Sequence, residues 1–142
     1  PVATARFHGP TGIAADNKGA VYIADRWNHR IRKIDATQNV TTVAGDGRTK
    51  IKDGQGTKSQ LIYPFDVAIS PQESVLFIHR VSTNIGDKYP NMIRKIDKSG
   101  YVSTLLQTDA VLESIVIDKK GTIFLAGAED HKIYQVVCTP IP

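Results

Sequence analysis

The chain has 142 residues, of which 41% are hydrophobic and 23% charged, and its formal net charge is +4. These fractions are typical of a globular protein large enough to bury a core. The apolar runs are too short to span a membrane, and the single cysteine, Cys138, excludes an internal disulfide framework. The positive charge is compatible with an acidic partner, but a mildly basic solvated surface explains it more simply.

Short β-rich runs separated by turn signals fill the chain. In the first third they occupy residues 12–16, 20–25 and 30–35, divided by a turn at 17–19 and a polar hairpin at 26–29. The same three runs recur at residues 65–70, 75–78 and 92–97, and again at 114–118, 122–126 and 131–136. A fourth strand follows at 40–45 and at 101–106 in the first two copies. Each unit is therefore predicted to be a sheet of short antiparallel strands, which we name a, b, c and d.

This repetition predicts a β-propeller, because four-stranded units that recur every 40 to 55 residues or so are typical of propeller blades. Ile31 and Ile34 lie on opposite faces of one strand, as a blade packed between two neighbours requires. No segment predicts a helix. We expect an all-β fold with blade units at residues 7–45, 61–106 and 111–137. These would be about three blades of a six-bladed ring, completed by the same longer chain or by a second copy.

The first unit resembles an NHL repeat over residues 10–16, 19, 21–25 and 28–31. The second unit departs from this pattern by placing His79 where the first has Asp25, and the third places Gly127 there. The resemblance covers nearly the whole chain and implies a six-bladed or similar propeller, a fold that hosts many activities. The segments Val-Thr-Thr-Val-Ala-Gly at 40–45 and Asp-Gly-Gln-Gly at 53–56 are similar to those of bacterial exported or cell-surface members. We therefore expect an extracellular or cell-envelope location, with the cytoplasm as the alternative.

The topology predicts one binding face. In a blade of four antiparallel strands the b–c and d–a connections lie at the same end, and both long excursions, at 45–60 and 80–91, are of these kinds. Long loops on a rigid scaffold often carry binding sites, although the first loop also fits a simple linker between blades. The residues expected to form this face are Arg26, Trp27, Asn28, His29, Arg48, Lys50, Arg80, Lys88, Tyr89, His131 and Lys132.

The hairpin at residues 25–30 is the sharpest cluster on this face. Asp25, Asn28 and His29 are expected to hold the b–c turn by hydrogen bonds. The repeat does not require Arg26 and Trp27, and both are residue types that dominate interface energies, so they are candidates for partner contact. The side chains expected to be exposed on this face, outside the core, are those of Arg26, Trp27, Arg80 and Tyr89.

The sequence predicts no catalytic residues, no cofactor and no metal site. The histidines are scattered over separate units, and no third ligand accompanies His29 and His131. The loop around Asp46 and Asp53 lacks the ligand spacing of a calcium loop. We therefore expect a non-catalytic propeller scaffold that binds a macromolecular partner, most simply a protein. An RNA-binding propeller and a metal-dependent lyase or hydrolase propeller are the alternatives.

Overall fold

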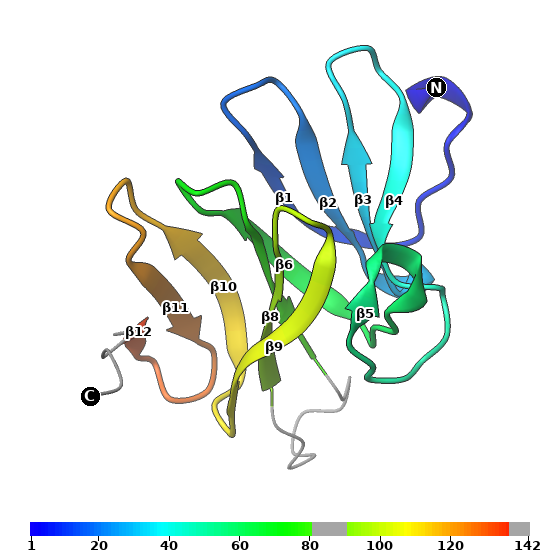
Figure 1. Ribbon diagram of the computed structural model, residues 1–142. Coiled ribbons are helices and arrows are strands. Elements are labelled where there is room, and N and C mark those ends of the chain that lie inside the picture. Colours follow the sequence, from blue (N-terminus) through cyan, green and yellow to red (C-terminus); the bar gives the residue numbers. More distant parts are fainter. Residues whose placement is uncertain (81–90, 137–142) are drawn as a thin grey trace.

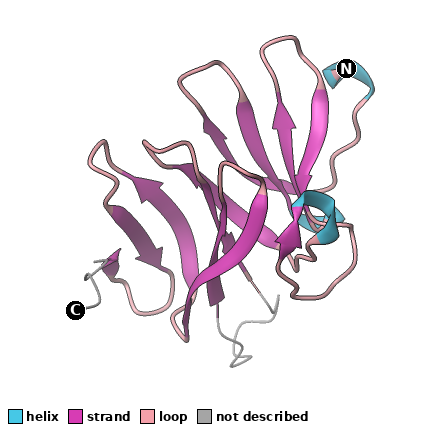
Figure 2. Cartoon of the chain, in the orientation of Figure 1, coloured by secondary structure: helices cyan, strands magenta, loops and turns pink. Residues whose placement is uncertain are grey.

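The computed structural model describes residues 1–80 and 91–136. Its strands form three antiparallel sheets that lie side by side in chain order (Figure 1). The helical segments of the described residues are three short 3-10 turns, η1 (Val2–Thr4), η2 (Arg26–Asn28) and η3 (Gly56–Lys58) (Figure 2). The expectation of an all-β propeller fold is confirmed.

Each sheet takes its strands in sequence order. The first contains β1 (Pro10–Ala15), β2 (Val21–Asp25), β3 (Arg30–Ile34) and β4 (Val40–Ala44). The second contains β6 (Pro64–Ile69), β7 (Val75–His79), β8 (Asn91–Ile96) and β9 (Tyr101–Thr108), and the third contains β10 (Leu112–Ile117), β11 (Ile123–Gly127) and β12 (Ile133–Val136). The inner strands β1, β6 and β10 neighbour one another, so the sheets radiate outward from them.

The three sheets share one register. Strand a pairs with strand b through Ile13 and Ile23 in the first sheet, Val67 and Phe77 in the second, and Ile115 and Leu125 in the third. The register shifts near the start of each inner strand, after Pro10, Pro64 and Leu112. Such irregularities re-aim nearby side chains. They lie at the b–c/d–a end of the sheets, where the candidate site is found.

The a–b turns are built as their sequences predict. The Asp16 carboxylate accepts hydrogen bonds from the backbone N–H groups of Lys18 and Ala20, at 2.9 and 2.8 Å. Asp118 repeats this arrangement in the third sheet. Gly19, with φ at +83°, supplies the left-handed residue that such a turn requires.

The loop between the first two sheets does more than link them. Its residues Gly54–Gln55 form strand β5, which pairs with the outer strand β9 and gives the second sheet a fifth strand. The Gln55 side chain also donates to the Ser99 carbonyl. The sequence did not indicate this strand, because two residues are too short to show a period.

The core lies between the sheets. Ile31 of the first sheet packs with Val67 and Phe77 of the second, and Ile93 of the second packs with Ile115 of the third. Both faces of the second sheet are therefore buried, as expected of a blade between two neighbours. None of the helical segments in the described part of the chain is long and apolar enough to cross a membrane.

Candidate functional site

The b–c turn of the first sheet is organised by the buried carboxylate of Asp25. Its Oδ1 accepts the backbone N–H of His8 at 2.8 Å, and its Oδ2 accepts from Asn28 Nδ2 at 2.9 Å. Arg32 Nη1 lies 3.5 Å from the same Oδ2. The carboxylate thus ties the entry of β1 to the turn that follows β2. The predicted structural role of Asp25 and Asn28 agrees with this geometry.

His29 also holds the fold in place. Its backbone is left-handed, with φ at +55°, and its Nδ1 accepts the backbone N–H of Tyr63 at 3.2 Å. The two rings lie 4.8 Å apart. Burial, and secondarily the charge of Arg30, lowers the pKa of His29, which favours the neutral ring that can accept this bond. His131 has a matching left-handed backbone, with φ at +57°, in the third sheet.

Two arginines converge on one aromatic ring at the same end of the sheets. The guanidinium carbon of Arg26 lies 5.2 Å from the centroid of Phe65, and that of Arg80 lies 4.3 Å from it. Arg26 also lies 4.8 Å from the Trp27 ring. Both distances to Phe65 fall within the range of cation–π contacts. We call Arg26, Phe65 and Arg80 the arginine cluster.

Arg80 is less exposed than the sequence predicts. Its side chain is only 17% exposed, because Phe65 covers one side and Glu113 lies opposite. Its Nη2 donates to Glu113 Oε1 at 2.7 Å and to the Leu112 carbonyl at 3.1 Å. Arg80 therefore joins the second sheet to the third, and the prediction of an exposed Arg80 side chain was wrong.

Trp27 lies beside this cluster and is exposed, as predicted. Its ring is packed edge-on against Tyr63, with centroids 5.2 Å apart, and the residue keeps 41% of its surface in solvent. His8 lies on another side, at 6.3 Å. Gly9 runs directly under the indole, where a Cβ atom would collide with it. A large aromatic surface is therefore held rigidly next to Arg26.

Repeat equivalence explains the cluster. The residue after strand b is Arg26 in the first unit, Arg80 in the second and Ala128 in the third. The residue after the first position of strand a is Thr11, Phe65 and Glu113 in the same order. Aligning the units through Asp25 and His79 pairs Arg26 with Arg80. The repeat pattern gave no comparable indication of the residues whose contacts cross between sheets, which are His8, Tyr63, Phe65 and Glu113.

Within the described part of the chain, the remaining predicted site residues make no contact with the arginine cluster. Arg48 is exposed and pairs with Asp46 of its own loop, at 3.3 Å. Lys50 is exposed on that loop, and His131 and Lys132 are exposed at the third b–c turn. Lys88 and Tyr89 lie outside the described residues. The arginine cluster thus takes Arg26 and Arg80 from the predicted set, and Trp27 lies beside it.

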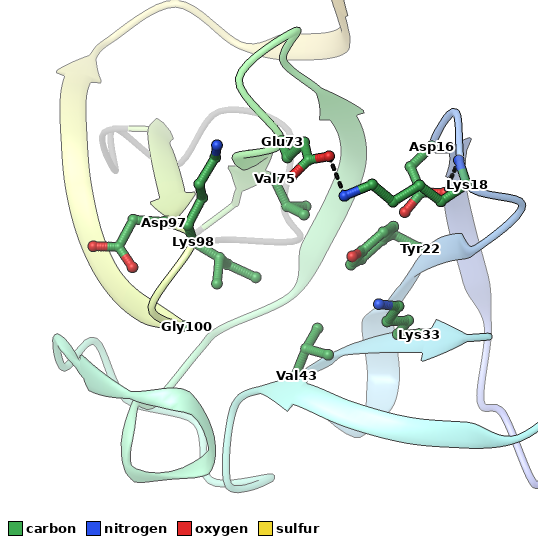
Figure 3. Close-up of a pocket in the computed structure, with 11 residues that line it drawn as sticks. Asp16, Lys18, Tyr22, Lys33, Val43, Glu73, Val75, Asp97, Lys98 and Gly100 are labelled. Carbon is green, nitrogen blue, oxygen red and sulfur yellow. Dashed lines mark hydrogen bonds and ion pairs between the residues drawn. The ribbon is translucent and has the colours of Figure 1, made fainter.

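A cavity lies at the opposite end, between the first two sheets (Figure 3). It has a volume of about 530 Å³, and its lining includes Tyr22, Val43 and Val75. Lys18 and Glu73 form an ion pair across it, and Lys33 lies 5.4 Å from the Tyr22 ring. The sequence did not indicate this cavity, which opens where the sheets diverge.

Within the described ranges, no group of three or more His, Cys, Asp and Glu side chains is placed to hold a metal ion. The arrangement at the b–c/d–a end instead offers a guanidinium and an indole side by side. Such a pair can recognise anionic and flat apolar groups.

Comparison with known proteins agrees with the fold. A structure titled an auxiliary nutrient binding protein from Bacteroides thetaiotaomicron superposes with a TM-score of 0.66 and 20% identity, over 87% of this chain and 36% of that one. Virginiamycin B lyase from Staphylococcus aureus superposes with a TM-score of 0.58 and 20% identity, over 89% of this chain and 40% of that one. These likenesses define the class, a β-propeller, and span a binding protein and an enzyme.

The sequence matches include NHL-repeat proteins. Residues 7–34 match the model of the NHL repeat. The chain is 36% identical to SUPPRESSOR OF QUENCHING 1 of Arabidopsis thaliana over 62% of its own length and 8% of the relative's. It is 32% identical to human NHL repeat-containing protein 2 over 52% of its own length and 11% of the relative's. The expected resemblance to NHL-repeat proteins is confirmed over these residues, and the chain spans about a tenth of the length of these relatives.

Proposed function

We propose that this chain is a non-catalytic propeller scaffold that binds a protein partner through its b–c/d–a face. The observation that carries the proposal is Trp27, a large exposed aromatic held rigidly against Tyr63 and next to Arg26. Tryptophan and arginine are the residue types most enriched at the energetic centres of protein interfaces. A preformed aromatic surface also loses little side-chain entropy on binding.

A matched pair of variants tests the proposal. Trp27→Ala removes the exposed aromatic at the b–c end, and Tyr101→Ala removes one of similar exposure, 44%, at the c–d end. Full-length protein and both variants are used to capture partners from an extract of the source cells, and each captured protein is then titrated against the purified variants. We expect Trp27→Ala to weaken its binding by about tenfold or more and Tyr101→Ala to leave it within about twofold. Equal effects of both variants would contradict the proposal.

Arg80→Ala is unsuited to this test. Arg80 joins two sheets through Glu113 and Leu112, so its loss changes the fold as well as the surface. We place the protein outside the cell or in the cell envelope, supported by the resemblance of residues 40–45 and 53–56 to exported family members. Fractionation of source cells with an antibody against the chain checks this location.

A further inference from the structure

The two repeat-equivalent arginines have different surroundings. Each reaches toward the first residues of the inner strand of the next sheet. Arg80 finds a carboxylate there, with Nη2 at 2.7 Å from Glu113 Oε1. Arg26 finds Phe65 at the equivalent place, with its guanidinium carbon 5.2 Å from the ring centroid. The first sheet therefore has the arginine of this ion pair, Arg26, but no carboxylate at the place that corresponds to Glu113.

No carboxylate of the described residues lies within 4 Å of the Arg26 guanidinium. Its buried Nε has no hydrogen-bond partner in the same part of the chain, but this is equally true of Arg80, so the two arginines differ in the carboxylate alone. Burial, and secondarily the charge of Arg80, lowers the pKa of Arg26; the charge of Glu113 opposes this shift in part, without forming an ion pair with Arg26. The guanidinium keeps its proton at any physiological pH. A partly desolvated cation without an acceptor is costly, and an anion bound from outside would remove that cost.

We propose that the partner supplies this anion: Arg26 binds a carboxylate of an acidic protein segment, with the exposed Trp27 ring beside it. The inference rests on the protein-binding function proposed above and adds the chemistry of the partner. A guanidinium fork matches a carboxylate in two parallel hydrogen bonds. The two nitrogens of Arg26 beyond Nε carry the donors for them.

The charges around Arg26 favour an acidic peptide over a nucleic acid. A protein surface that binds a nucleic-acid strand normally carries a row of unpaired cations along the path of the phosphate backbone. Here Arg80 is already paired with Glu113, so the described residues of this cluster offer one available cation rather than a row. Trp27 offers a single aromatic surface next to a single available guanidinium. This suits one acidic side chain flanked by apolar contacts.

The test uses a fluorescein-labelled peptide of four Asp-Glu repeats with blocked ends, measured by anisotropy against the full-length protein. A matched peptide of Asn-Gln repeats and an eight-nucleotide polyuridine RNA are the comparison probes. We expect the acidic peptide to bind, Arg26→Met to weaken it by about tenfold, and Arg26→Lys to restore part of the loss. Arg48→Met, which removes the same charge from the exposed loop, should change binding by less than about twofold.

A second variant supplies the missing anion from within the chain. Phe65→Glu places a carboxylate where Glu113 lies in the next sheet, so it should occupy Arg26 and weaken the acidic peptide about as much as Arg26→Met does. Thermal unfolding of each variant identifies any loss of the fold. If Arg26→Met binds the acidic peptide as the parent does, or if the RNA binds more tightly and depends on Arg26, the proposal is overturned. Either result leaves the Trp27→Ala comparison unaffected, so the two proposals fail separately.

Discussion

The imidazole of His79 occupies in the second sheet the place that the Asp25 carboxylate occupies in the first. Asp25 accepts the backbone N–H of His8 at 2.8 Å, and His79 Nε2 accepts that of Ile62, the equivalent residue, at 2.7 Å. Both side chains are fully buried. Each also faces an arginine of strand c. Arg32 Nη1 lies 3.5 Å from Asp25 Oδ2, and Arg94 Nη1 lies 3.3 Å from His79 Nδ1. The first two units therefore both place a buried acceptor at this position, one charged and one neutral, whereas the third unit has Gly127 there.

This substitution makes stability depend on pH. Burial, and secondarily Arg94, lowers the pKa of His79 from 6.5 to about 3. The unfolded chain keeps the ordinary pKa, so it binds an additional proton between these values. The contribution of neutral His79 to the free energy of unfolding is therefore fully present above pH 6.5. It is lost as the pH drops from 6.5 toward 3, by about 1.4 kcal/mol per pH unit. His79→Asp should keep the hydrogen bond to Ile62 and remove this slope.

Urea unfolding at pH 7, 6 and 5 checks this expectation. His29 also has a lowered pKa and adds to the slope in the same direction, so the difference between parent and variant isolates His79. His131→Asn, at an exposed histidine, is the control and should follow the parent. A parent and a His79→Asp variant with equal slopes would show that His79 is not the responsible group.

The packing of the Trp27 indole is expected to require a glycine at position 9. It has a left-handed φ of +55°, and a Cβ atom there would collide with the indole. Gly9→Ala should cost about 1 to 3 kcal/mol and shift the emission of Trp27, the only tryptophan of this chain. Gly19→Ala is the matched control, because its φ is +83° but a Cβ atom would meet nothing within 4 Å. Equal losses in both variants would mean that only the backbone, and not Trp27, opposes the substitution.

The blade pattern could be predicted from the sequence, because strand alternation and Asp-to-Gly turns are local signals. The acceptor role of Asp25 could be predicted for the same reason. The arginine cluster could not, since the contact between Arg26 and Phe65 joins residues of different sheets. Arg80 was expected to be exposed because its partner Glu113 is distant in sequence. Contacts between blades depend on how the sheets stack, which the alignment of repeats does not reveal.

Val67 and Ile13 occupy equivalent positions and should respond differently to a charge. Val67 is 3% exposed because it packs against the first sheet, whereas Ile13 is 69% exposed. Val67→Asp buries an unpaired carboxylate and should cost at least about 3 kcal/mol. At a concentration low enough to keep the 142-residue chain monomeric, Ile13→Asp should change its free energy of unfolding by less than about 0.5 kcal/mol. Urea unfolding of both variants measures the difference, and comparable losses would show that Ile13 is covered in solution.

The outer faces of the first and third sheets should make the 142-residue chain self-associate. Ile133 is 73% exposed, although its equivalents Ile31 and Ile93 are fully buried by a following sheet. Val116 is 58% exposed on the third sheet. Exposed apolar side chains on an uncovered sheet face promote association. Light scattering should therefore give a mass above the 15.5 kDa of one chain. Ile133→Lys combined with Ile13→Lys should move the mass toward that of the monomer, because each places a charge on one open face. A parent chain that stays monomeric and folded would contradict this expectation.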